Sequence, residues 1–426
     1  MVQRDGRTLV SLSLEARINS RAEEIDTGRR PEPFKIRSYN QLLRFPVDNG
    51  YGADGMRPAI DAIIVPTIRP ARQLHVAAEL AIQAQCQLIS FHTKSFPDGL
   101  ASVLGRLAPG TATALALRSD ARHRLLQLGT DIPQSLVPPP ALDISTKRNL
   151  GLLIGRACGW TRMLFLDDDV CSLDAEKLKK ASALLTKYPV VGLQVKTYPD
   201  ASVVGHARRK TGYSQEPFIS GGALLVDPQR LDSFFPPVYH EDWLCVINHL
   251  RRGEVAIGGT VGQLKFQPFI KPERAALEEF GDILAGGLLW LVVNTRSGTP
   301  AGEYGPASAD RQYWREAIKP RFWGDVLKQR ETLLDNLTMR LKAFRDPERP
   351  LESLKAASKR LEQLTPHEFV SFVEKWLGNL VRWRYQLAGL PKAGTVAKAM
   401  AELRLSDIVR TYKDDLRSQP PGESGP

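Results

Sequence analysis

The sequence lacks the features that mark secreted and membrane-spanning proteins. Residues 1–20 hold no apolar run of the kind found in secretory signals, so we expect no such signal. The longest apolar stretch, residues 283–294, is too short to cross a bilayer and predicts a buried or interfacial helix. The four cysteines are scattered without a CxxC pair, which is typical of reduced, buried thiols. Together these absences favour a cytoplasmic protein.

A dense basic segment is also lacking, although the chain as a whole is basic. It contains 58 Lys and Arg against 47 Asp and Glu, for a formal net charge of +11. This balance favours anionic partners, such as nucleotides, nucleic acid or a membrane surface, but does not choose among them. Because the positive charge is not gathered in a basic arm, we expect no nucleic acid partner. Peripheral contact with a membrane and assembly into a homo-oligomer both stay open.

Apolar runs alternate with helical patterns from residue 59 onward. Residues 59–67 and 86–93 are expected to be strands, and residues 71–85 between them repeat apolar side chains at helical spacing. A strand, a helix and a strand in this order predict a right-handed βαβ unit and a parallel sheet. Residues 98–107 and 119–128 are expected to be helices, residues 113–117 a strand, and the proline-rich residues 136–145 a loop. A helix at 145–159, capped by Ser145 or Thr146, and a strand at 162–169 are expected to follow.

The chain divides into four segments by composition. Its length and its hydrophobic fraction of 42% suit a large α/β core with a second region beside it. From residue 272 onward almost every stretch has a helical pattern. We therefore expect a loop-rich lead-in at 1–58, an α/β catalytic domain at 59–271, a mainly helical C-terminal region at 272–415 and a disordered tail at 416–426.

Three carboxylates, Asp167, Asp168 and Asp169, directly follow the apolar run at 163–166. Adjacent carboxylates repel one another, so they require either a solvated turn or a cation. In an open parallel sheet, ligands gather beyond the carboxyl ends of the strands, where these acids are expected. Side chains alternate along an extended chain, which predicts Asp167 and Asp169 on one side and Asp168 on the other. Such a pair can hold Mg²⁺ together with a diphosphate, while a solvated acidic turn is the plainer alternative.

Several cations are expected near the same edge of the sheet. Arg69 follows the first strand, and Lys147, Arg148 and Asn149 stand at the expected start of a helix. A helix N-terminus with cations beside it suits an anion, although each residue alone is more often a solvated surface group. As a set they suit a nucleoside diphosphate.

Two groups downstream complete the candidate site. Gly221 and Gly222 interrupt an apolar strand pattern, and glycine is expected where the backbone approaches another group closely; a β-bulge is the alternative. His240, Glu241 and Asp242 precede a helix. Acids at that position favour the helix dipole, so they predict either helix capping or a general base near an acceptor hydroxyl.

Four segments of the chain, taken in their sequence order, resemble the GT-A class of nucleotide-sugar glycosyltransferases, especially the GT2-like enzymes. The segments are DAIIVPTIRP, TKRNLGLLIGRACG, FLDDDV, and FISGGALLVDP followed by HEDWL. The resemblance covers residues 59–270. It implies a GT-A fold, which is Rossmann-like with a mostly parallel central sheet. It also implies Mn²⁺ or Mg²⁺ as cofactor, a sugar donor of the UDP or GDP type, and an acceptor that stays unidentified.

The resemblance also implies a role for each candidate residue. Asp167 and Asp169 would match the DxD pair, with Asp169 contacting the metal and Asp167 nearer the ribose. Asp242, beside Glu241, would match the acid that is the usual base in inverting members. The residues expected around the nucleotide sugar are Thr67, Arg69, Lys147, Arg148, Asn149, Asp167, Asp168, Gly221 and Gly222.

Two features of such enzymes are missing. They often carry an Asp pair after the second strand that reads the base, whereas this chain has His92, Thr93 and Lys94 there. Some also have a histidine metal ligand after the acceptor helix, where this chain has Gln263 and Gln267. The base and the third metal ligand are therefore not predicted.

Three other functions share part of this pattern. A sugar-nucleotide mutase of the reversibly glycosylated type also has a DDD run in a GT-A-like fold and would need no acceptor. A haloacid dehalogenase phosphatase also has a strand followed by DxD, but it needs Thr or Val where Cys171 stands. A non-enzymatic basic binding or scaffold protein would explain the charge but not the acids at the strand ends.

Overall fold

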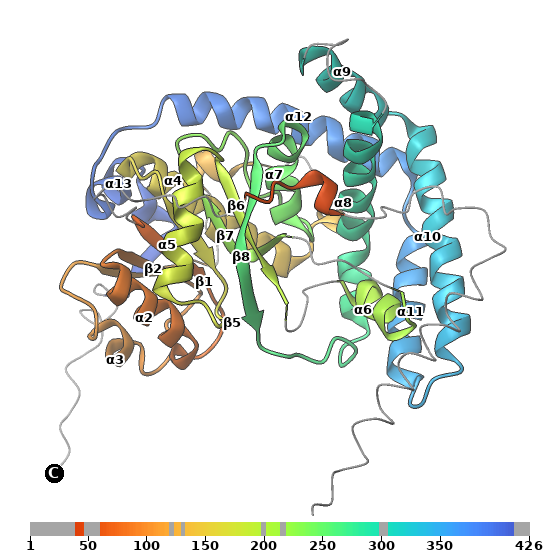
Figure 1. The fold of residues 1–426 in the computed structure, drawn as a ribbon, viewed down its shortest axis with the longest axis horizontal. Coiled ribbons are helices and arrows are strands. Elements are labelled where there is room, and N and C mark those ends of the chain that lie inside the picture. Colours follow the sequence, from red (N-terminus) through yellow and green to blue (C-terminus); the bar gives the residue numbers. More distant parts are fainter. Residues whose placement is uncertain are drawn as a thin grey trace, which may run out of the picture.

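The computed structural model describes residues 39–46, 60–118, 123–128, 133–196, 202–213, 219–297 and 306–412. In these residues a nine-stranded sheet runs through an α/β body, and a group of long helices packs beside it (Figure 1). The predicted tail at 416–426 and most of the lead-in at 1–58 lie outside the described residues.

The sheet is mixed but mostly parallel. Its order is β5-β8-β6-β7-β4-β1-β2-β3-β9, and β5, β7 and β9 run against the other six strands. The strands are β1 (Ala62–Pro66), β2 (Gln87–Thr93), β3 (Ala112–Leu117), β4 (Met163–Leu166), β5 (Val170–Cys171), β6 (Val190–Val195), β7 (Ile219–Val226), β8 (Val255–Gln263) and β9 (Val409–Thr411).

Helices cover both faces of the sheet, which explains why β1 is apolar at every position. Ile64 belongs to the core that contains Leu150 of α4, whereas Ile63 belongs to a second core with Leu178 of α5. The helices are α2 (His75–Ala84), α3 (Leu100–Leu104), α4 (Pro139–Cys158), α5 (Ala175–Ala183), α6 (Val203–Lys210), α7 (Glu241–Arg252), α8 (Glu273–Ser297), α9 (Pro306–Ala317), α10 (Pro320–Leu341), α11 (Glu348–Leu361), α12 (Pro366–Ala388) and α13 (Val396–Glu402).

The expected strands at 59–67, 86–93 and 162–169 are confirmed as β1, β2 and β4, with β4 ending earlier, at Leu166. The helix expected at 119–128 is wrong where the structure describes it, because only a short 3₁₀ helix forms at Arg124–Leu126. The sequence reading also missed α6, which lies between β6 and β7.

The start of α4 corrects a second expectation. The helix begins at Pro139, six residues before the expected cap at Ser145 or Thr146. Proline fits the first turn of a helix because its missing N–H would have no intrahelical partner there. The three prolines at 138–140 therefore start the helix instead of forming a loop. Residues 147–149 lie in its third turn, so the predicted anion site at a helix N-terminus is not formed there.

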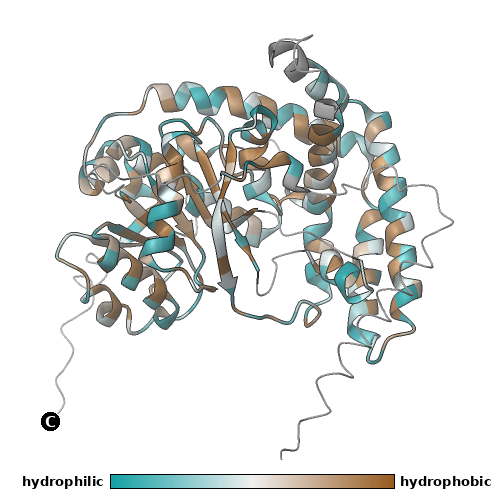
Figure 2. Ribbon diagram, viewed as in Figure 1, coloured by the Kyte–Doolittle hydropathy of each residue, from teal (hydrophilic) through white to brown (hydrophobic). Residues whose placement is uncertain are grey.

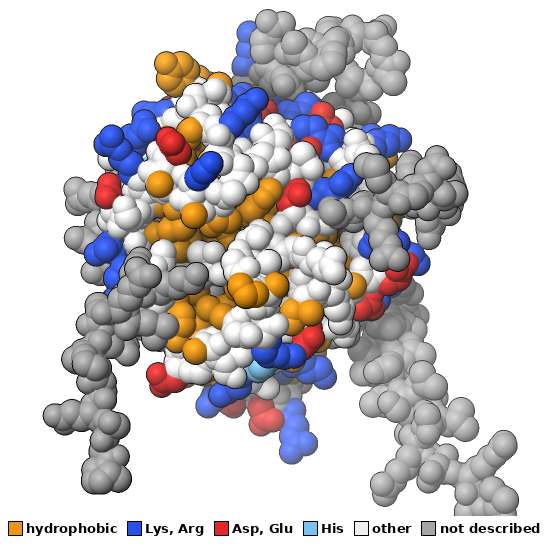
Figure 3. Space-filling model, turned by 90° about the vertical axis from the view of Figure 1, so that its left-hand side faces the viewer, with side chains coloured by type: hydrophobic (Ala, Val, Ile, Leu, Met, Phe, Trp, Pro, Cys, Tyr) orange, Lys and Arg blue, Asp and Glu red, His pale blue; other side chains and the backbone are white. Residues whose placement is uncertain are grey.

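The C-terminal region is mainly helical, as expected, but it returns to the sheet. Residues 283–294 lie within α8, where most of their side chains are buried, and β9 pairs with β3 to form one edge of the sheet. None of the described helices is both long and apolar enough to cross a bilayer. Hydrophobic residues mark the strands and the inward faces of these helices (Figure 2), while Lys and Arg spread around the edge of the face shown in Figure 3.

A buried ion cluster joins α8 to α10. Arg330 of α10 donates from Nε and Nη2 to the two carboxylate oxygens of Glu279 at 2.7 Å each, and from Nη2 to Asp282 at 2.7 Å. The Glu279 side chain is fully buried, and burial raises its pKa although Arg330 opposes the shift. The cation therefore neutralises one fully buried carboxylate, Glu279, and one mostly buried carboxylate, Asp282.

We expect Arg330→Met to lower the free energy of unfolding by about 3–5 kcal/mol, because it leaves two buried carboxylates without a cation. Chemical denaturation measures the change. Arg345→Met is the control, since Arg345 and its partner Asp346 are almost fully exposed and such pairs contribute little. Equal stability of the two variants would contradict this role for Arg330.

Candidate active site at the carboxyl edge of the sheet

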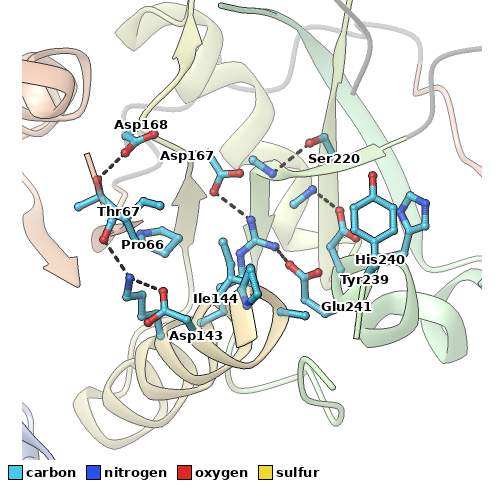
Figure 4. A pocket seen from close by; sticks show the side chains of 18 of the residues that line it. Pro66, Thr67, Asp143, Ile144, Asp167, Asp168, Ser220, Tyr239, His240 and Glu241 are labelled. Carbon is cyan, nitrogen blue, oxygen red and sulfur yellow. Dashed lines mark hydrogen bonds and ion pairs between the residues drawn. The ribbon is translucent and has the colours of Figure 1, made fainter. Parts of the chain in front are cut away.

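A cavity of about 720 Å³ opens at the carboxyl edge of the sheet (Figure 4). It lies beyond the ends of β1, β2 and β4, and the antiparallel strand β7 enters the sheet at the same edge. The backbone N–H of Asp167 donates to the carbonyl of Gly222 at 2.8 Å, which fixes the two segments side by side. The polar residues that line it include Thr67, Arg69, Thr93, Asp143, Lys147, Arg148, Asp167, Asp168, Asp169, Ser220, His240, Glu241, Asp242 and Glu278.

Arg148 is the charged centre of this site. Its buried guanidinium bonds Asp167 at 2.9 Å from one nitrogen and pairs with Glu241 from the other. Burial alone would lower the pKa of Arg148, but Asp167, Glu241 and Asp242 outweigh it and raise the pKa above its usual value. Arg148 therefore carries a permanent positive charge that joins β4, α4 and α7.

Arg69 holds the other two acids of the run. Its two terminal nitrogens lie 3.2 Å from an oxygen of Asp168 and 3.1 Å from an oxygen of Asp169, and Thr67 donates its hydroxyl to Asp168. The expected alternation is therefore wrong, because β4 ends before the acids and the backbone turns through them. Burial raises the pKa of both Asp168 and Asp169, and Arg69 opposes the shift.

Lys147 lies at the floor of the cavity and is fully buried. Its ammonium donates to the carbonyl of Thr67 at 2.9 Å, to the hydroxyl of Thr93 at 2.6 Å and to Asp143 at 2.6 Å. Burial lowers the pKa of Lys147, although Asp143 opposes the shift. Asp143 was missed from the sequence; its position one helical turn before Lys147 was the available signal.

Asn149 does not line the cavity. Its side-chain amide donates to the carbonyl of Phe235 at 2.8 Å and accepts from the Phe235 N–H at 2.9 Å. These two bonds hold the segment before α7 against α4. The structure therefore gives Asn149 a supporting contact, whereas the sequence reading had placed it at the nucleotide.

The two glycines of β7 stand where the backbone meets charged side chains. A Cβ at Gly221 would overlap the guanidinium of Arg148 and the side chain of Asp242, and one at Gly222 would lie 3.0 Å from an oxygen of Asp167. The expected close approach is thus confirmed. The groups that lie against the two glycines are side chains of this protein, namely those of Arg148, Asp242 and Asp167.

Asp242 lines the same cavity from the first turn of α7. One of its oxygens accepts from the Gly221 N–H at 2.5 Å and the other from its neighbour Trp243 at 2.8 Å. His240, in the left-handed region at φ 62°, stacks on Trp243 and bonds Asp282 at 3.0 Å. The sequence placed His240 beside Glu241 and Asp242 but gave it no role of its own, and its contact with Asp282 of α8 was not predicted.

The acid run offers two oxygens to a divalent cation. Oδ1 of Asp169 is buried and accepts no direct hydrogen bond, although the Gln263 side chain also interacts with this carboxylate, and Oδ2 of Asp167 faces Gly222. Among the described residues, no three His, Cys, Asp or Glu side chains gather as a metal site. Asp167 and Asp169 thus fit only a cation that takes its remaining ligands from substrate oxygens and water, as Mg²⁺ commonly does.

We expect Gly221→Ala to destabilise the protein by about 1–3 kcal/mol, because the new methyl group must displace Arg148 or Asp242. Thermal unfolding measures the effect. Gly286→Ala in α8 is the matched control, since no atom lies within 4 Å of the added carbon and alanine favours a helix. If Gly221→Ala unfolds at the wild-type temperature, the crowding around Arg148 is not real.

Glu241 predicts a pH dependence. Burial raises its pKa from 4.5 to about 7; Arg148 opposes the shift and Asp242 adds to it. Folding then favours the protonated carboxyl, so its contribution to stability is present at low pH and is lost as pH rises through about 7. Between pH 4.5 and 7 we expect wild type to lose free energy of unfolding relative to Glu241→Gln, measured by denaturation at each pH. If the free energies of unfolding of wild type and Glu241→Gln change with pH in the same way, the raised pKa of Glu241 is contradicted.

Comparisons with known proteins add little to this description. No protein-family model matches the chain, and no curated protein matches it. Among solved structures, galactosyltransferase LgtC in complex with donor and acceptor sugar analogues is similar over 46% of this chain and 72% of its own, at 14% sequence identity and a TM-score of 0.27. A likeness this weak supports no conclusion about the reaction. What is established is a mixed α/β fold with a mostly parallel central sheet and a helical C-terminal region.

Proposed function

We propose that the protein is a glycosyltransferase that moves a sugar from a nucleoside diphosphate to an acceptor bound in the same cavity. One observation carries the proposal: three adjacent carboxylates, two guanidinium groups and a separate carboxylate, Asp242, meet in one cavity at the carboxyl edge of the sheet. Ligands of open α/β folds bind at this edge. A solvated acidic turn would not bury Asp168 and Asp169 beside a cavity.

The donor would lie on the side of Arg69. This side chain is 41% exposed at the cavity and bridges Asp168 and Asp169. A guanidinium presents several donors in one plane and suits the oxygens of a diphosphate. As the bond between the sugar and the diphosphate breaks, negative charge grows on the leaving group, and Arg69 stabilises it. Arg148 cannot approach as easily, because Asp167 and Glu241 hold it in the wall.

The acceptor would lie on the side of Asp242. In an inverting reaction its carboxylate takes the proton of the attacking hydroxyl, since both of its oxygens keep a lone pair after accepting one backbone N–H each. Glu241 is the weaker candidate because Arg148 engages it. In a retaining reaction no base is needed, and Asp242 orients the acceptor or the sugar.

Mn²⁺ or Mg²⁺ would be held by Asp169 and Asp167. When bound, the cation would supply positive charge to the departing diphosphate as a Lewis acid. Oδ1 of Asp169, which accepts no direct hydrogen bond, supports this assignment. The two arginines already neutralise part of the acid run, so the chain does not depend on the metal to keep these carboxylates together.

We expect UDP or GDP, or one of their sugars, to raise the unfolding temperature more with Mn²⁺ than without it. A ligand at about 100 times its Kd adds about 2.7 kcal/mol to the free energy of unfolding. Asp169→Asn should remove the metal-dependent part. Asp174→Asn is the control, because Asp174 is exposed and caps α5 through a bond that Asn can also make.

An equal metal-dependent shift in Asp169→Asn would reject the metal site, and no shift with any nucleotide would reject the donor class. A nucleotide sugar that rearranges without any acceptor would favour the mutase instead.

A further inference from the structure

Part of the cavity wall is apolar and lies among the charged groups. Pro139, Pro140 and Ile144 contribute to it from the first turns of α4, and Ile219 and Leu277 add to it from β7 and α8. Ligand cavities commonly combine apolar side chains with a few polar groups that fix the orientation of the ligand. These five side chains therefore fit an apolar part of a ligand.

Exposed aliphatic side chains surround the mouth of the cavity. Ile68 is 78% exposed and Leu277 is 45% exposed, and both line the cavity. Leu264 is 47% exposed, and its N–H donates to the carbonyl of Asp169 at 2.9 Å, which places it at the same edge. Single exposed aliphatic residues are ordinary, but a group at the mouth of an apolar cavity marks an interaction site.

Positive charge accompanies these side chains. Lys94 lines the cavity and is exposed, and Lys265 and Lys271 are exposed on the segment that joins β8 to α8. Within the described part of the chain, none of the three forms an ion pair. The stretch 264–277 has Glu273 as its single acid beside Lys265, Lys271 and Arg274, so this stretch is net positive. Aliphatic side chains with lysines beside them are complementary to an anionic lipid surface.

We propose that the mouth of the cavity docks on an anionic lipid bilayer, and that the acceptor is a lipid whose apolar part lies along the α4 proline wall. Ile68, Leu264 and Leu277 would enter the interface while the lysines meet the headgroups. The acceptor's nucleophile then reaches Asp242 without leaving the bilayer completely. The acceptor half of this inference rests on the proposed function, whereas the docking half does not.

The docking half is tested by sedimentation of the full chain with lipid vesicles. We expect binding to phosphatidylcholine vesicles that contain about one third phosphatidylglycerol to exceed binding to pure phosphatidylcholine by about tenfold or more. The variant Ile68→Asp/Leu264→Asp/Leu277→Asp should lose about tenfold of that binding. Met339→Asp/Val381→Asp, at positions 61% and 67% exposed on α10 and α12, should keep it.

A second pair of variants tests the charge. Lys265→Glu/Lys271→Glu should abolish the preference for anionic vesicles, while Lys355→Glu/Lys359→Glu, exposed on α11, should keep it. Circular dichroism and thermal unfolding establish that each variant is folded. Wild-type protein that binds neither kind of vesicle, or equal loss in mouth and control variants, overturns the docking surface.

The acceptor half is tested by incubating wild-type protein with the nucleotide sugar that stabilises it, labelled in the sugar, and with lipid vesicles. Label that partitions into the lipid phase supports the inference, and label that moves only to added protein or soluble sugar overturns it. Nucleotide binding without vesicle binding keeps the proposed function and rejects the lipid surface. Vesicle binding without any nucleotide binding rejects the proposed function and keeps the surface.

Discussion

The buried guanidinium of Arg148 is the interaction on which the rest of the site depends. The guanidinium pairs with Asp167 after β4 and with Glu241 at the start of α7. It has room there because Gly221 has no side chain. Withdrawing charges from water is costly, and only mutual pairing in a fixed geometry offsets that cost. Asp167 and Glu241 can therefore lie at the sheet edge because α4 brings a cation between them, while Arg69 holds Asp168 and Asp169. The long α4, begun by its prolines, is thus a condition for the acid run.

The helical C-terminal region is connected to the same site by a chain of polar contacts. Arg330 of α10 fixes Asp282 of α8, and Asp282 bonds His240, which directly precedes Glu241 and Asp242. His240 holds a left-handed backbone conformation that a non-glycine residue adopts at some cost. Its ring stacking and its bond to Asp282 offset that cost. The position of Asp242 therefore depends on helices far from the sheet, which explains why this region belongs with the α/β domain in one packed core.

Local patterns in the sequence predicted the features that depend on neighbouring residues, such as strands and close backbone approaches. Apolar runs located β1, β2 and β4. Gly221 and Gly222 marked a close backbone approach, and the alternative that was kept for them, a β-bulge, also has support because the register between β6 and β7 shifts across Ile219–Leu224. The failures came from interactions that span the chain. Asn149 looked like a ligand residue because its partner Phe235 lies 86 positions away, and β9 was missed because three residues form a strand only beside β3. The prolines at 138–140, which start α4, were expected in a loop because proline can end one helix as well as begin another.

The two arginines differ in what they can do. Arg148 is buried with carboxylates on both sides, so releasing either one would leave a charge without water or partner. Arg69 is partly exposed, so it can exchange Asp168 and Asp169 for other partners, provided that another cation takes over these two mostly buried carboxylates. If a diphosphate enters, Arg69 is the group able to turn toward it, and the oxygens that it leaves become available to a divalent cation. Donor and metal would then bind in a linked manner, with Arg148 as the fixed charge and Arg69 as the movable one.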